Sequence, residues 1–317
     1  MPTTEERLAA LEKQMAAWMT QQPTTYYTHQ YSGEEIDESV GVTQDTVPTL
    51  VRPNLLDNWY FGRPVNQRGQ TEYKGDWMYS FDRWKVSPSS TVSISGGGLS
   101  VIADFQQAIL STALILGQKY TMSVLSTDGR LGQLTFTLQQ DVSINQGFGF
   151  GYFAIYRDAD QYWFRLYGTN EATYLAIKLE LGHTQTLAHR EGDRWVPNEV
   201  PNYGDQLRRC QMDLFKIGDA VRYCSLGNGV ARDSQFVSIT IPTPVTMRTI
   251  PVLIAPPVGF TMRHNDTIVS GGANFSVDAF SQNSIMLKVQ SQVALTPGDM
   301  WEAFLQPNGS LVFSAEL

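Results

Sequence analysis

Alternation between apolar and polar residues dominates the chain after about residue 54 and predicts β-strands. The clearest alternating segments are residues 120–124, 134–138, 148–156, 162–167, 175–181, 237–241, 275–277, 285–289 and 310–313. Turn-forming sequences, such as those at 157–160 and 168–170, separate neighbouring segments. Short strands joined by such turns, without helices between them, favour antiparallel sheets packed as a two-layer sandwich.

The N-terminal segment has helical periodicity instead. Apolar residues recur there at alternating spacings of three and four, the pattern of a coiled-coil seam, at Leu8, Leu11, Met15 and Trp18. A helix this short is only marginally stable alone in water, so we expect it to associate with other copies as an oligomerisation helix spanning residues 1–22. A helix that packs on its own domain is the alternative.

A second helical pattern lies in the C-terminal half, where Tyr203, Leu207, Cys210 and Leu214 recur at helical spacing. Together these patterns predict an all-β protein with five parts. The N-terminal helix is followed by an extended attachment arm at residues 23–51, a β-sandwich at 52–196, a helical connector at 197–230 and a second, small β-sandwich at 231–317.

The amino-acid composition argues against two classes of function. The formal net charge of the 317 residues is -8, so the chain offers no basic surface of the kind that binds nucleic acid. The longest apolar run is far shorter than a membrane-spanning helix, and no secretory signal precedes the charged N-terminal segment. We therefore expect a protein made in the cytoplasm that neither inserts into membranes nor binds nucleic acid.

The sequence contains no standard catalytic motif, and we expect no enzyme activity, no catalytic residue and no cofactor. His183 and His189 are poorly spaced for a shared metal ion, so no metal site is predicted. Carboxylates that could form the acid pair of a glycan hydrolase are Asp82, Asp104, Asp158, Asp160 and Glu180, but the sequence cannot show which of them face each other. Cys210 and Cys224 lack CxxC spacing and are both expected to be ordinary buried thiols.

The candidate binding residues lie on the strand predicted at 162–167. If Tyr162, Phe164 and Leu166 face the core, then Trp163, Arg165 and Tyr167 share the outward face. Such a row can stack on a sugar ring or anchor a protein interface. The alternative is that a neighbouring subunit covers this face as well.

Several sequence strings point to a known group of proteins. They are YSGEEID at residues 31–37, NLLDNWYFGRPVNQRGQTEY from residue 54, FDRW at 81–84, LAIKLELGHTQTLAHREGDRWVPNEVPNYGDQLRRCQ from residue 175 and PTPVTMRTIPV in the C-terminal part. Across about residues 26–215 the chain resembles tail-fibre-like and minor structural proteins of tailed bacteriophages and prophages. The resemblance implies a homotrimeric virion component with a central jelly-roll domain like a carbohydrate-binding module, used in many cases for attachment to a host-surface glycan.

The resemblance leaves the position on the particle open. Many such fibres carry a long shaft between the YSGEEID and NLL strings, whereas here only a short segment intervenes. Our expectation is a non-enzymatic virion protein, attached to other virion proteins by its N-terminal arm, that binds a bacterial surface glycan. The alternatives are a purely architectural head-fibre or decoration protein and, third, a polysaccharide depolymerase.

Overall fold

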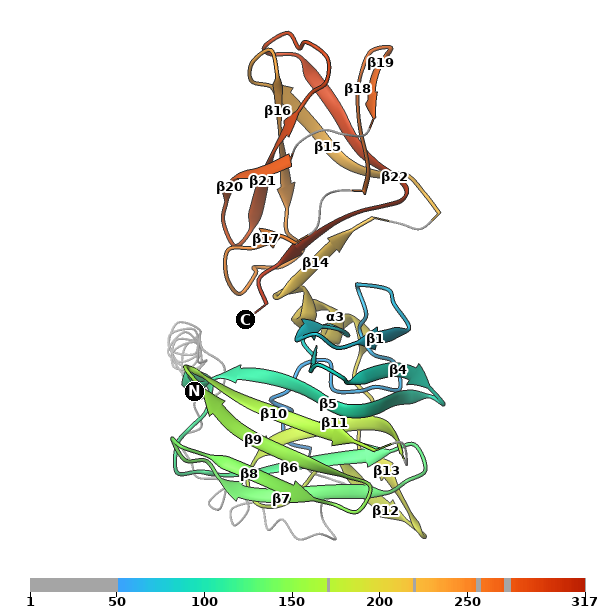
Figure 1. Cartoon of the computed structure of the whole chain (residues 1–317), viewed down its shortest axis with the longest axis vertical. Coiled ribbons are helices and arrows are strands. Elements are labelled where there is room, and N and C mark those ends of the chain that lie inside the picture. Colours follow the sequence, from blue (N-terminus) through green and yellow to red (C-terminus); the bar gives the residue numbers. More distant parts are fainter. Residues whose placement is uncertain (1–50, 170–171, 219–220, 255–257, 271–274, 317) are drawn as a thin grey trace, which may run out of the picture.

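The computed structural model describes residues 51–169, 172–218, 221–254, 258–270 and 275–316. These residues form two β-units, one above the other in Figure 1, with the helix α3 (Tyr203–Gln211) between them. The predicted N-terminal helix and attachment arm lie outside the described residues. Within the described part the protein is predominantly β with one short α-helix, as predicted, and its sheets have the arrangement of a sandwich. The jelly-roll and coiled-coil assignments stay predictions.

The first unit is a sheet of eleven strands with a central order of β7-β6-β11-β5-β10-β9-β8. Its strands are β1 (Glu72–Lys74), β2 (Met78–Tyr79), β3 (Lys85–Val86), β4 (Thr91–Ser95), β5 (Gly98–Leu110), β6 (Lys119–Ser126), β7 (Leu131–Thr137), β8 (Ser143–Gly147), β9 (Gly151–Asp158), β10 (Gln161–Gly168) and β11 (Thr173–Leu181). A 3-10 turn, η2 (Ser111–Ala113), follows β5, and a separate hairpin is formed by β12 (Ala188–Glu191) and β13 (Arg194–Pro197).

The long strand β5 lets this one sheet form two layers. Its first residues pair with β4 and β11, whereas the residues after Ala103 pair with β10. Ala103 has a φ of 65°, a left-handed conformation that breaks the regular extension of the strand. The two layers enclose an aromatic core in which Trp84 stacks on Phe105 with ring centroids 4.5 Å apart.

The second unit is a nine-stranded sheet with a central order of β19-β18-β22-β15-β16-β21-β20. Its strands are β14 (Leu214–Ile217), β15 (Cys224–Ala231), β16 (Phe236–Pro242), β17 (Val252–Leu253), β18 (Val258–His264), β19 (Thr267–Ser270), β20 (Phe275–Phe280), β21 (Ser284–Gln290) and β22 (Met300–Ser314). The long strand β22 changes its pairing partners along its length, as β5 does. It pairs with β15 and β18 before Asn308, which has a φ of 65°, and with β14 and β17 near its end.

The predicted helical connector at 197–230 is only partly helical. Helix α3 is present, and the Asn202 side chain caps it by accepting a hydrogen bond from the Gly204 amide. Strands β14 and β15, however, belong to the second sheet, which therefore begins at Leu214 and not at residue 231. In the amino-acid sequence, the glycines of β15 are more typical of a loop than of a strand. At Gly229 the absent side chain has a packing role, because a Cβ there would lie 2.5 Å from a methyl carbon of Val237.

Candidate functional site

The outward face of β10 carries the three predicted binding residues. Tyr162, Phe164 and Leu166 are buried in the core, so the predicted alternation along this strand is confirmed. Trp163, Arg165 and Tyr167 share the opposite face. Their register partners on β9 are Tyr156, Ala154 and Tyr152, and β5 supplies Ala108, Gln106 and Asp104 on the other side. Figure 1 shows β5, β10 and β9 running side by side in the lower unit. We call this surface of β8, β9, β10 and β5 the aromatic face.

A stacked pair of tyrosines occupies one end of the aromatic face. The rings of Tyr152 and Tyr167 are nearly parallel, at 10°, with centroids 4.2 Å apart. On the edge strand β8, the register partner of Tyr152 is Gly147. Gly147 has no side chain, and the nearest heavy atom to a Cβ built there is 3.9 Å away. One ring face of the pair is therefore bordered by open space on the β8 side.

A row of hydrogen-bonding groups crosses the middle of the face. Arg165 forms an ion pair with Asp104 at 3.2 Å, and its Nε donates to the Gln106 side-chain oxygen at 3.1 Å. The Tyr156 hydroxyl donates to the same oxygen at 3.0 Å and accepts from Arg165 Nη2 at 3.2 Å. These contacts fix the Arg165 guanidinium on the sheet. Asn145 on β8 is the register partner of Ala154 and is exposed, so its amide is accessible beside the tyrosine pair.

Trp163 is the least accessible of the three predicted residues. It is only 8% exposed, because Tyr156 stacks beside it at 6.4 Å and the Lys85 ammonium lies 4.8 Å from its ring centroid. Tyr152 and Tyr167 are both half-buried and offer more ring surface. The tyrosine pair, and not Trp163, is the part of this face best placed for stacking.

The sequence pattern predicted Trp163, Arg165 and Tyr167 on β10 but not the residues that lie beside them on other strands. The residues that join the site from other strands are Lys85, Asp104, Gln106, Asn145, Gly147, Tyr152 and Tyr156. A signal existed on β9, where Tyr152 and Tyr156 have the spacing of residues on one strand face. The contribution of β5 and β8 could not be found in this way, because it depends on strand order.

Three of the five carboxylates considered for acid catalysis are tied to separate structural partners. Asp82 accepts hydrogen bonds from Gln67, Glu180 accepts from Thr186, and Asp104 pairs with Arg165. Burial raises the pKa of both Asp82 and Glu180. Within the described residues, no group of three or more His, Cys, Asp or Glu side chains is placed to hold a metal ion. Leu8, Leu11, Met15 and Trp18, the predicted oligomerisation residues, lie outside the described residues.

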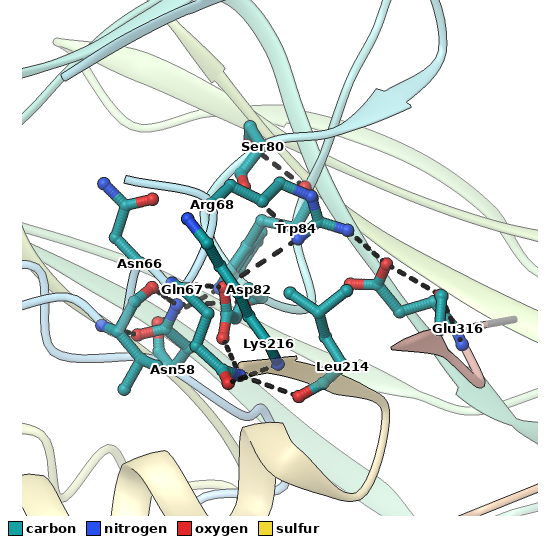
Figure 2. A network of polar contacts seen from close by, with 12 residues as sticks. Asn58, Asn66, Gln67, Arg68, Ser80, Asp82, Trp84, Leu214, Lys216 and Glu316 are labelled. Carbon is teal, nitrogen blue, oxygen red and sulfur yellow. Dashed lines mark hydrogen bonds and ion pairs between the residues drawn. The ribbon is translucent and has the colours of Figure 1, made fainter. Parts of the chain in front are cut away.

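A polar network joins the two β-units, and Figure 2 shows it at close range. Gln67 of the first unit donates through Nε2 to Asp82 at 2.6 Å and to the Leu214 carbonyl at 2.8 Å. Arg68 pairs with Glu316 near the end of the chain. These bonds connect the loop before β1 in the first unit to the start of β14 and to the residues just after β22 in the second unit.

A cluster of five charged residues lies at the same junction. Arg83 contacts Asp57 at 3.2 Å and Asp213 at 3.0 Å, and it is almost fully buried. Arg248 pairs with Asp213 at 2.8 Å, and Arg209 pairs with Asp57 at 2.6 Å. Burial alone would raise the pKa of Asp57, but the three guanidinium groups together lower the pKa below its ordinary value. Asp57 is therefore held in its charged form, and the ion pairs of the cluster fix the two units to each other.

No family model, curated protein or solved structure matches the chain. In the described part of the chain, no helix has the length and apolar character needed to span a membrane.

Proposed function

We propose that the protein is a non-enzymatic component of a tailed-phage virion that binds a host-surface glycan through its aromatic face. The observation that carries the binding role is the Tyr152–Tyr167 pair, which borders the side-chain-free position Gly147. The virion assignment rests on the sequence resemblance to tail-fibre-like proteins. It includes a homotrimer, attached through the N-terminal arm.

The chemistry of the face suits a sugar ring. The C–H face of a pyranose packs on an aromatic ring, and its hydroxyls need donors and acceptors nearby. Here Tyr152 supplies the ring, while Asn145 and Arg165 supply polar groups in the next cross-strand row, on either side of Ala154. A shallow site of this kind binds weakly, but several copies on one particle raise the avidity by orders of magnitude.

The test is a glycan-array and affinity-electrophoresis comparison of purified variants. We expect Tyr152→Ala to weaken binding about tenfold or more, because it removes the stacking surface. Gly147→Leu should weaken it similarly by filling the space beside the ring, although no aromatic residue changes. The matched control is Tyr223→Ala, since Tyr223 is 67% exposed on the second unit, away from the aromatic face.

Two other outcomes would replace the proposal. If Tyr152→Ala and Gly147→Leu lower the molecular mass in light scattering and glycan binding is absent, the aromatic face is a subunit interface and the protein is architectural. If the purified protein shortens the polysaccharide that it binds, it is a depolymerase.

A further inference from the structure

A cavity opens at the junction of the two β-units, away from the Tyr152–Tyr167 pair. Its volume is about 330 Å³, within the range of small-molecule sites. Four parts of the fold contribute to it: the segment that precedes the first sheet, Arg83 before β3, the end of β5 with the turn that follows it, and helix α3 with the loop after β16. The cavity combines apolar walls with a charged end.

The apolar walls come mainly from the end of β5 and from η2. Ile109, Leu110, Ala113 and Leu114 line this side, and Met212 lines the side of α3. Ala113 is exposed and Leu110 is half-buried, so this apolar surface is accessible to a ligand. Such surface binds an aliphatic or aromatic body by removing it from water.

The charged end is dominated by guanidinium groups. The lining includes Arg83, Arg209 and Arg248 but only one carboxylate, Asp57. Asp213 belongs to the same ion cluster without lining the cavity, so the cluster as a whole has three positive and two negative charges. The end of the cavity therefore favours an anion.

Donors for an anion remain on the two outer arginines. Arg209 and Arg248 are 37% and 29% exposed, whereas Arg83 is 5% exposed. A guanidinium has five N–H donors. Among the described residues, the contacts of Arg209 use only Nη2, and those of Arg248 use Nε and Nη2. The Nη1 groups of both arginines are thus available to a carboxylate or another oxyanion.

We propose that this cavity binds a small organic acid. The apolar body of the ligand packs between Leu110 and Met212, and its carboxylate takes hydrogen bonds from Arg209 and Arg248. The site shares Ala108 with the aromatic face but includes neither Tyr152 nor Tyr167, and its test does not depend on glycan binding. Since its walls come from both β-units, a bound ligand stabilises the junction between them.

The test is isothermal titration of the full chain with sodium octanoate and with benzoate, which carry the same anionic group on an aliphatic and an aromatic body. We expect saturable binding of at least one of them at one site per chain. Octyltrimethylammonium, which has the opposite charge on the same aliphatic chain, should not bind. Arg209→Gln should weaken binding about tenfold, whereas Arg208→Gln on the same helix should not, because Arg208 does not line this cavity.

Ala113→Trp tests the position of the site without changing any charge. Ala113 is exposed, so the indole can fill the cavity entrance without entering the core, and we expect it to abolish binding. Thermal unfolding checks that each variant is folded. The proposal is overturned if neither acid binds saturably, if the ammonium compound binds as tightly, or if the folded Ala113→Trp variant binds like the wild type.

Discussion

Replacing Arg83 with Met tests whether the buried charge cluster holds the protein together. Arg83 is the only one of the three clustered arginines that is almost fully buried, and it contacts both Asp57 and Asp213. Met has similar volume and no charge. The φ of 73° at this position is unfavourable for both residues, so backbone strain cancels in the comparison. The substitution therefore isolates the loss of the central cation.

The expected cost follows from the two carboxylates that remain. Asp213 is fully buried and Asp57 is 11% exposed, so neither can be solvated well after the guanidinium is lost. Removing one partner of a buried ion pair costs about 3 to 5 kcal/mol. Arg248 and Arg209 still contact the carboxylates, so we expect the lower end of that range. About 3 kcal/mol lowers the midpoint of thermal unfolding by roughly 6 to 12 °C.

The assay is urea unfolding followed by circular dichroism, with Arg190→Met on the exposed β12–β13 hairpin as the control. The pH dependence identifies the cause. The pKa of Asp57 is lowered in the folded protein, so its stabilising contribution is present at neutral pH and is lost as the pH falls below the ordinary value of 3.8. The difference in the free energy of unfolding between wild type and Arg83→Met should therefore become smaller in acid. A cost below about 1 kcal/mol at neutral pH, or one that does not change in acid, would refute this reasoning.

Two further predictions concern packing and assembly. Gly168→Ala should destabilise the first unit by about 1 to 3 kcal/mol in urea unfolding, because the new Cβ would lie 2.1 Å from the Val101 carbonyl oxygen. The control Gly147→Ala should change the free energy of unfolding by less than about 0.5 kcal/mol. Equal effects of the two substitutions would contradict the close packing of β10 on β5. Leu11→Asp should abolish the predicted oligomer, because a charge cannot be accommodated in a coiled-coil seam, and an unchanged mass in light scattering would rule out that seam.

The period of two in the hydrophobic pattern was enough to predict nine of the described strands, but it fails where a strand changes layer. On strand β10, Tyr162, Phe164 and Leu166 are buried in the core as expected, but Trp163 on the other face is buried as well. Strand β5 was not predicted, because residues on both of its faces are buried and it pairs with four different strands. Strand β15 was missed for another reason: Gly229 packs against Val237 and Ile239 of β16, a contact that the local sequence does not encode.

The candidate site was predictable only along one strand. Alternation placed Trp163, Arg165 and Tyr167 together, but it could not show that Lys85 and Tyr156 cover Trp163. The role of Gly147 depends on the pairing of β8 with β9. The junction cavity was beyond sequence reasoning, because Arg83, Arg209 and Arg248 are far apart in the chain and meet only when the two units pack.

We propose above all that this protein is a virion component that displays the aromatic face to a host surface. Immunogold electron microscopy of intact particles, with an antibody raised against residues 52–317, tests it most directly. The account predicts gold at a tail or baseplate position, with label lost when the particles are incubated with host cells before the antibody is added. Particles without label would contradict the virion assignment, and label confined to the capsid that host cells do not block would contradict the attachment role.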